Sequence, residues 1–242
     1  MPTPASPLER GWHTGELIVV VGASQSGKTY WTKQQIRKAE RLIIWDREGQ
    51  YLDCVDRAAT DIVQLERMIK ANPRRLRVAF IPPRGEGLAA VFTRWCDCAF
   101  VFADIACSHT GRDYSRIPTV IVAEELAHVT NPGKAPPGWL ELISTGLKRN
   151  AHIYGIMQRP SECDKTIMGN CSQIHCHGMQ RAVDRQYMAA EMDIPLAWLA
   201  ALDRSKHQYI HKDMRTGRIA PGSTVPRPPR ATKTAKNLEG RG

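Results

Sequence analysis

The chain has 242 residues and a formal net charge of +10 at pH 7, with 34 Lys and Arg residues against 24 Asp and Glu residues. This length is enough for one large α/β domain with its own core. The excess of positive charge favours a polyanionic partner, and nucleic acid is the first candidate. The chain has seven cysteines, an odd number, and its start shows no secretion signal. These features predict free thiols in a reducing compartment and argue against a secreted, disulfide-linked protein.

The composition along the chain predicts three parts. Residues 1–14 are a loose lead-in that contains Pro and Ser, and residues 15–221 carry the periodic patterns of one folded domain. Residues 222–242 form a basic tail with several prolines, which we expect to be disordered. The longest mostly apolar region, residues 95–107, contains two aspartates and is too short to span a bilayer.

The first pattern in chain order is a strand, residues 16–21, followed by the sequence GASQSGKT at residues 22–29 and a helix over residues 30–40. The eight residues fit G-x-x-x-x-G-K-[ST], the phosphate-binding P-loop, in its required strand–loop–helix context. Backbone N–H groups of such a loop and of the helix N-terminus point at phosphate. The motif predicts ATP as a ligand, with Lys28 at the β- and γ-phosphates and the Thr29 hydroxyl on Mg²⁺. The residues expected at the nucleotide are Gly22, Ala23, Ser24, Gln25, Ser26, Gly27, Lys28, Thr29 and Tyr30.

Further strands and helices alternate along the rest of the chain. Apolar runs predict strands over residues 41–45, 77–81, 119–123, 152–157 and 173–177, and a terminal hairpin is expected from residue 207 to residue 219. Helical spacing predicts helices over residues 60–71, 88–106, 139–149, 181–192 and 195–202. This alternation predicts a mainly parallel sheet with helices on both faces, a RecA-like P-loop core whose ligand chemistry lies at the carboxyl ends of the strands.

A pair of carboxylates ends the strand at residues 119–123. Hydrolysis of a nucleotide needs one carboxylate to hold hydrated Mg²⁺ and a second to orient and deprotonate the attacking water. We assign Glu124 to the metal and Glu125 to the water, because adjacent residues at a strand end can serve both purposes. Gln158 ends the next strand, where a neutral amide can contact the γ-phosphate or the water.

Three segments together resemble the FtsK/HerA superfamily of DNA-pumping ATPases: residues 22–29, VIVAEE at residues 120–125, and LKRNAHIYGIMQRP at residues 147–160. The superfamily has a basic residue just before a strand that ends in Thr-Gln-Arg-Pro; here Met157 replaces the Thr. Glu124 replaces the usual Asp of an Asp-Glu pair, and Asp46 resembles an Asp at the end of the second strand. The chain's size is similar to that of the genome-packaging ATPases of tectivirus-like, tailless viruses with double-stranded DNA.

The resemblance implies further roles for individual residues. Arg149 becomes a finger that reaches the γ-phosphate of the neighbouring subunit, with Lys148 as the alternative, and Gln158 becomes a sensor. The implied assembly is a homo-oligomeric ring, usually a hexamer, with double-stranded DNA in a basic central channel. Capsid or portal-vertex proteins are the other implied partners, in the virion or the host cytoplasm. The basic tail is then either a contact for nucleic acid or capsid, or a solvated end.

Other functions remain open at this point. A DNA motor of the same superfamily in conjugation or plasmid processing would share the motifs. A P-loop small-molecule kinase is disfavoured because a water-activating carboxylate is poorly suited to excluding hydrolysis, and the set Lys28, Thr29 and Glu125 disfavours a non-enzymatic scaffold. The cluster Cys163, Cys171, His175, Cys176 and His177 lacks zinc-site spacing, and on a strand His175 and His177 face away from Cys176.

Overall fold

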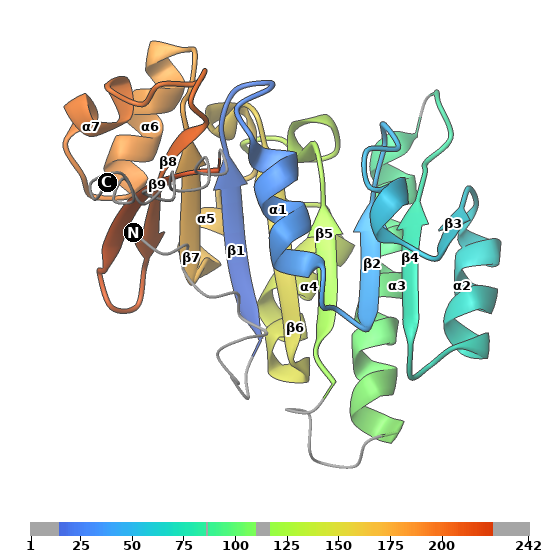
Figure 1. The fold of residues 1–242 in the computed structure, drawn as a ribbon. Helices are drawn as coiled ribbons and strands as arrows, with labels where there is room; N and C mark the ends of the chain where they lie inside the picture. Colours follow the sequence, from blue (N-terminus) through green and yellow to red (C-terminus); the bar gives the residue numbers. More distant parts are fainter. Residues whose placement is uncertain (1–14, 86, 110–116, 225–242) are drawn as a thin grey trace, which may run out of the picture.

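A nine-stranded sheet runs through the described part of the chain (Figure 1). The computed structural model describes residues 15–85, 87–109 and 117–224. The strands lie in the order β3-β4-β2-β5-β6-β1-β7-β8-β9. Every neighbouring pair from β3 to β7 is parallel, whereas β8 pairs antiparallel with both β7 and β9. This confirms the predicted α/β class with a mainly parallel sheet. The strands are β1 Glu16–Val21, β2 Arg41–Trp45, β3 Arg57–Ala59, β4 Leu76–Phe80, β5 Thr119–Ala123, β6 Ala151–Met157, β7 Gln173–His177, β8 Gln208–Asp213 and β9 Ile219–Ser223.

Helices cover both faces of the sheet, as expected. The α-helices are α1 Lys28–Ile36, α2 Ile62–Ala71, α3 Leu88–His109, α4 Pro137–Thr145, α5 Thr166–Asn170, α6 Ala182–Glu191 and α7 Leu196–Ala200. Short 3₁₀ helices are η2 Leu52–Cys54, η3 Leu126–His128, η4 Gly146–Arg149 and η5 Pro160–Glu162. Figure 1 shows α1 in front of the sheet and α3 and α4 behind it, and the arrowheads of the parallel strands all point to the same edge.

Several boundaries differ from the prediction. The helix expected over residues 30–40 begins at Lys28 and ends at Ile36, because the chain turns there through an Ala39 N–H···Ile36 O bond of 3.0 Å to enter β2. The helix expected over residues 139–149 is α-helical only to Thr145 and continues as the 3₁₀ helix η4. The strand β3 and the helix α5 were not predicted, since neither has an apolar pattern of its own and β3 pairs only with β4.

The structure describes only part of the chain that the sequence divides into lead-in, domain and tail. The lead-in, residues 1–14, and residues 225–242 of the tail lie outside the described residues. The last strand, β9, continues to Ser223 and therefore crosses the expected boundary between residues 221 and 222. In the described part of the chain, no helix has the length and apolarity that a membrane crossing requires.

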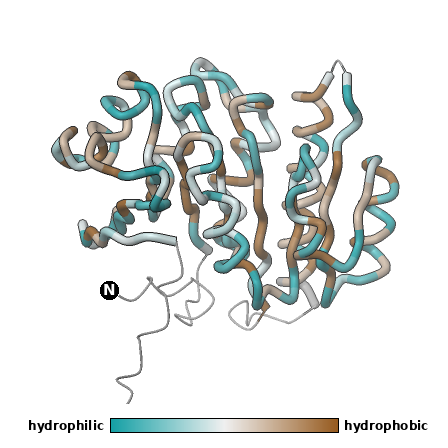
Figure 2. Tube along the Cα trace, turned by 45° about the horizontal axis from the view of Figure 1, so that its top comes forward, coloured by the Kyte–Doolittle hydropathy of each residue, from teal (hydrophilic) through white to brown (hydrophobic). Residues whose placement is uncertain are grey.

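The core has two layers, one on each face of the sheet. In β1, Leu17, Val19 and Val21 face the larger layer formed with α2 to α6, whereas Ile18 and Val20 face the smaller layer under α1. A strand buried on both faces needs apolar residues at every position, which explains the continuous run LIVVV. Figure 2 shows the hydrophobic colour concentrated on the central strands.

Trp45, the last residue of β2, lies in an aromatic cluster of the larger layer. Its ring centroid is 5.0 Å from that of Phe92 and 5.7 Å from that of Trp95, both on α3, and 5.6 Å from that of Phe80 on β4. Large aromatic side chains dominate core energetics through the area that they bury. This cluster therefore joins α3 to the half of the sheet that lies beyond β5.

A second cluster joins α1 to β7 and β8 on the other face. Trp31 of α1 stacks on His175 with ring centroids 3.7 Å apart, and His175 Nε2 lies 3.1 Å from His177 Nε2. His175 Nδ1 lies 3.4 Å from His211 Nδ1, and Tyr209 packs against the His175 ring. Burial, together with the charges of Lys28 and His207, lowers the pKa of His177 to about 3. Burial also holds the pKa of His175 well below its usual range. The imidazoles of His175 and His177 therefore act as neutral packing and hydrogen-bonding groups.

The cysteines do not join the histidines in a metal site. Cys163, Cys171 and Cys176 pack in the larger core layer, on the side of the sheet away from His175 and His177. The six cysteines whose side chains the structure describes are free thiols. Among the described residues there is no group of three or more His, Cys, Asp or Glu side chains that could hold a metal ion.

We predict that Trp45→Ala lowers the free energy of unfolding by about 3–5 kcal/mol, the usual cost of emptying a large aromatic site in a core. Trp198 on α7 is the matched control, since 48% of it is exposed and its replacement by Ala should change stability by less than about 0.5 kcal/mol. Urea denaturation followed by circular dichroism measures both. A cost below about 1 kcal/mol for Trp45→Ala would contradict the proposed role of the cluster.

We predict that His177 makes the fold less stable in mild acid. The unfolded chain takes up a proton at His177 below pH 6.5 and the folded chain does not until about pH 3, so this contribution to stability is present above pH 6.5 and decreases as the pH falls. Relative to His177→Gln, the wild type should lose on the order of 2 kcal/mol between pH 7.5 and pH 5. Denaturation of both proteins at each pH isolates this residue, and equal pH dependence in the two would refute the expectation.

Candidate active site at the carboxyl edge of the sheet

The loop between β1 and α1 has a glycine wherever a side chain would not fit. Gly22 has φ of 152°, and a Cβ atom there would lie 2.6 Å from Cβ of His177 and 2.7 Å from Oγ of Ser26. Gly27 has φ of 100° and precedes the first residue of α1. Glycine reaches such conformations without steric cost. The loop borders a cavity of about 720 Å³, which is lined by Ser24, Gln25, Ser26, Gly27, Lys28, Thr29, Tyr30, Gln50, His207 and Thr224.

Lys28 lies against the inside of this loop. Its Nζ donates hydrogen bonds to the carbonyl oxygens of Gly22 at 2.9 Å and Ala23 at 2.8 Å. Burial lowers the pKa of Lys28 to about 8, although the charges of Glu125 and Glu124 act in the opposite direction. A buried ammonium beside the loop is a binding group for an anion, because an anion compensates the cost of desolvation.

Glu124 lies opposite Thr29 at the end of β5. The Thr29 hydroxyl donates to Glu124 Oε1 at 3.3 Å and is 3.1 Å from Oε1 of Gln50. Asp46, at the end of β2, accepts the backbone N–H groups of Gln50 and Tyr51 at 2.8 Å each. Burial raises the pKa of Glu124 to about 8, with further contributions from Asp46 and Glu125. A hydroxyl and carboxylates are the oxygen ligands that Mg²⁺ prefers, so these residues fit a magnesium ion.

Glu125 follows Glu124 and contacts the residue that follows β6. It has φ of 56°, in the left-handed region, and its Oε1 accepts a hydrogen bond from Nε2 of Gln158. His128 Nδ1 lies 3.7 Å from Glu125 Oε2. The structure thus brings Lys28, Thr29, Glu124, Glu125 and Gln158 together at one edge of the sheet.

Arg149 lies at the opposite edge. It belongs to η4, which precedes β6, whereas Gln158 follows β6, and seven strand residues at about 3.3 Å each separate the two by roughly 20 Å. Arg149 Nε is 2.6 Å from Asp104 Oδ1, and its guanidinium lies 4.6 Å from the centroid of the Phe100 ring. Lys148 is exposed at the same edge. Neither basic residue lies near the phosphate-binding loop of its own chain.

Three residues of the cavity were missed by reasoning from the sequence. Gln50 comes from the turn after β2, and His207 and Thr224 come from the two ends of the β8–β9 hairpin. A Cβ atom at Gly27 would lie 2.7 Å from Oγ1 of Thr224, so the hairpin packs directly on the loop. No local signal marks these residues, because only the folding of the hairpin onto β7 brings them to the nucleotide edge.

Comparison with known proteins places this geometry in a family. No protein-family model matches the sequence. Protein P9 of Pseudoalteromonas phage PM2 is 32% identical over 201 residues, which cover 81% of this chain and 84% of P9.

Solved structures share the fold. The genome packaging NTPase B204 of Sulfolobus turreted icosahedral virus 2, in complex with AMPPCP, has a TM-score of 0.65 at 13% identity, over 86% of this chain and 96% of B204. The cytoplasmic domain of the type VII secretion ATPase EccC of Thermomonospora curvata has a TM-score of 0.57 at 14% identity, over 86% of this chain and 25% of that protein. The chain belongs to the same family as protein P9 of phage PM2, and it shares its fold with the packaging NTPase B204 and with the secretion ATPase EccC.

Proposed function

We propose that the chain is an ATP-driven translocase that packages double-stranded viral DNA into a preformed capsid. The observation that carries the proposal is the convergence of five side chains at one edge of the sheet: Lys28 and Thr29 line the cavity, Glu124 contacts Thr29, and Glu125 contacts Gln158. These residues supply every group that hydrolysis of a nucleoside triphosphate needs: an anion cradle, metal ligands and a carboxylate for water.

The residues divide the chemistry between them. Lys28 and the loop N–H groups hold the phosphates, and Thr29 and Glu124 would hold Mg²⁺, which neutralises charge that develops on the phosphoryl oxygens. Glu125 orients the attacking water and takes its proton. Gln158 donates to Glu125, so this amide is placed to respond when the γ-phosphate leaves.

The assembly that we propose is a ring, with six subunits as the usual number. Arg149 at the far edge of the sheet stabilises transition-state charge in the site of a neighbouring subunit, with Lys148 as the alternative. Its distance from the loop of its own chain supports a role in trans. DNA occupies a basic central channel, and the tail that follows Thr224 adds positive charge for DNA or capsid.

Kinship with a phage protein and a fold shared with a packaging NTPase support the viral setting. In that setting the ring would work at the packaging vertex of the virion or in the host cytoplasm, with capsid or portal proteins as partners. The complex of B204 with AMPPCP supports ATP as the nucleotide.

The deciding experiment measures ATP turnover with and without double-stranded DNA, together with the solution mass. We expect turnover that DNA stimulates and a mass several times that of the 27.1 kDa chain. Lys28→Ala is the negative control, because it removes the ammonium that holds the phosphates. If the protein is monomeric and DNA does not change its rate of ATP turnover, the proposed translocase function is excluded.

We predict that Glu125→Gln slows ATP hydrolysis about a hundredfold or more, the usual effect of losing a general base, while ATP still binds. Glu124→Gln should instead weaken Mg²⁺-dependent nucleotide binding. Single-turnover kinetics and fluorescent-nucleotide titration separate the two effects. Glu66→Gln on α2 is a control outside the site. The purer hydrolysis defect in Glu124→Gln would mean that the two roles are exchanged.

We predict that mixed rings of Arg149→Ala and Glu125→Gln subunits recover part of the wild-type turnover. Each variant alone should be nearly inactive, since an arginine finger contributes about 10³–10⁵-fold. In a mixed ring, a subunit with native Glu125 meets a neighbour with native Arg149, and that interface is complete.

Mixing Lys28→Ala with Glu125→Gln is the matched control for this recovery. Both changes lie in the site of one subunit, so no interface regains a complete set and turnover should stay absent. If rings proven to be mixed show no recovery for the Arg149 pair either, the trans role of Arg149 is excluded.

A further inference from the structure

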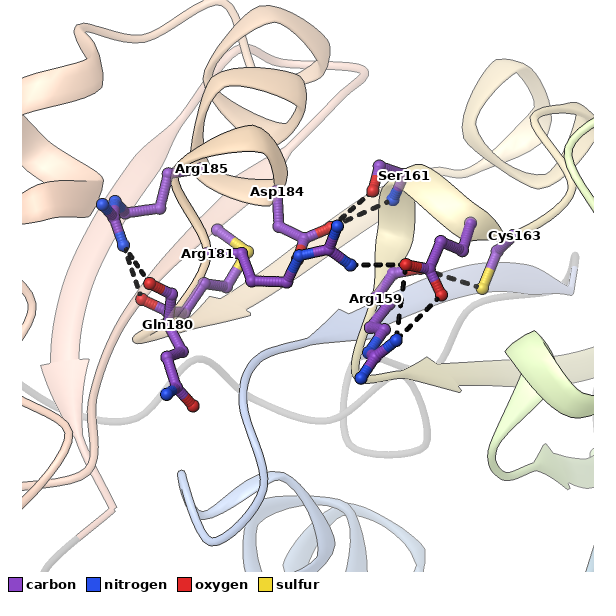
Figure 3. Close-up of polar contacts among 9 residues, drawn as sticks. Arg159, Ser161, Cys163, Gln180, Arg181, Asp184 and Arg185 are labelled. Atoms are coloured by element: carbon purple, nitrogen blue, oxygen red, sulfur yellow. Dashed lines mark hydrogen bonds and ion pairs between the residues drawn. The ribbon is translucent and has the colours of Figure 1, made fainter.

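Two arginines meet on one glutamate beside the carboxyl ends of β6 and β7. Arg159, which follows Gln158, has its Nη1 3.3 Å from Glu162 Oε2, and Arg181, before α6, donates from Nη1 to Glu162 Oε1 (Figure 3). We call these three residues the arginine fork. All three are exposed, and the hydrogen bond from Arg181 and then Arg159 lower the pKa of Glu162.

Buried contacts hold the two arms of the fork in place. Asp184 of α6 is buried, and its Oδ1 accepts from the Ser161 hydroxyl at 2.7 Å and the Ser161 N–H at 3.4 Å. Its Oδ2 is 4.0 Å from Arg181 Nε. Arg185 Nη1 donates to the carbonyl oxygens of Met179 at 3.1 Å and Gln180 at 2.8 Å, which fixes the turn before α6 (Figure 3). The guanidinium groups are therefore presented from a fixed base.

The fork adjoins the groups that we assign to hydrolysis. Gln158 donates to Glu125 and is the residue directly before Arg159. On the other arm, the carbonyl oxygen of Gly178, three residues before Arg181, accepts the N–H of Ala23 in the phosphate-binding loop at 3.1 Å. A displacement of Arg159 would thus shift the contact between Gln158 and Glu125, and a displacement of Arg181 would shift the contact between Gly178 and the phosphate-binding loop.

The charge around the fork favours an anion. The exposed Arg204, whose neighbour Asp203 is paired with Lys206, packs against Gly178, where a Cβ atom would lie 2.5 Å from its Cγ, so a further arginine lies on the Arg181 side of the fork. Two guanidinium groups that converge on one carboxylate have the geometry that also suits a phosphate. Because Glu162 is exposed, its replacement by a phosphate exchanges one solvated ion pair for another.

We propose that Arg159 and Arg181 contact DNA phosphates, that Glu162 occupies the place of a phosphate when DNA is absent, and that contact with DNA is passed to Glu125 through Gln158. This inference rests on the proposed function and adds the surface through which DNA stimulates hydrolysis. Gln158 is hydrogen-bonded to Glu125; a phosphate that draws Arg159 from Glu162 moves the adjacent Gln158 and releases the carboxylate for water.

The test compares double-stranded DNA binding by the full-length wild type, Arg159→Gln and Arg181→Gln across a series of salt concentrations. Each lost phosphate contact should make the slope of log K against log salt shallower by about one. Arg94 on α3 is the matched control, since it is exposed and lies 4.0 Å from Glu66 of α2 in a similar ion pair on other helices. Arg94→Gln should leave the slope unchanged.

Removal of the Glu162 carboxylate, which competes with DNA phosphates for the two arginines, should strengthen DNA binding. Glu162→Gln should tighten DNA binding several-fold, whereas Glu66→Gln should not, although the two glutamate side chains are equally exposed at 43%. DNA-stimulated turnover tests the coupling. Arg181→Gln should raise the DNA concentration for half-maximal stimulation, and Arg159→Gln should also lower the maximal stimulation, because it adjoins Gln158.

Three outcomes would overturn the inference. One is an unchanged salt slope in both arginine variants while the wild type binds DNA in a salt-dependent way. Another is a change of oligomeric mass in these variants with the slope intact, which would make the fork a contact between subunits. The third is a wild type that neither hydrolyses ATP nor binds DNA, and this outcome alone also removes the proposed function.

Discussion

The parallel ladder between β1 and β6 is the constraint on which the rest of the structure depends. Six residue pairs, from Glu16 with His152 to Val21 with Met157, align the two strands, and the Gly22 N–H continues the ladder to Met157 O at 3.3 Å. This register places the phosphate-binding loop level with Gln158. β5 lies on the other side of β6, so Glu124 and Glu125 reach the same edge. A shift of one residue would turn every β1 side chain to the wrong core layer.

The site combines two buried ionisable groups, a lysine and a glutamate, and each is costly to ionise without a ligand. Burial lowers the pKa of Lys28 and raises that of Glu124, both to about 8, so burial favours the neutral form of each group. A triphosphate favours the charged lysine, and a divalent cation favours the charged carboxylate. A bound triphosphate would thus compensate the cost of charging Lys28, and a bound divalent cation would compensate the cost of charging Glu124.

The two edges of the sheet carry different basic residues, and their surroundings differ accordingly. Arg149 at the amino edge of β6 is held by Asp104 and the Phe100 ring, which fixes its direction. Arg159 at the carboxyl edge is held by the exposed Glu162, a partner that another anion can replace. In the proposed ring, the first suits a fixed contact with a neighbour's nucleotide, and the second suits repeated contact with a moving DNA backbone.

Local sequence alone determined the fold class, most strands and the residues of the site that follow them. Continuous apolar runs identify β1, β2, β5 and β6 because strands buried on both faces admit few polar residues. The rule that ligands bind at the carboxyl ends of parallel strands then predicted one edge for Lys28, Glu124 and Gln158, and the structure places them there.

Only the tertiary structure decided which distant segments meet. His207 and Thr224 line the cavity because β8 pairs antiparallel with β7, and His177 fills the space under Gly22 because β7 lies beside β1. Glu162 joins Arg159 to Arg181 because η5 packs on α6. These contacts depend on strand order and helix packing, which arise from burial of the whole core and leave no mark in the local spacing of residues.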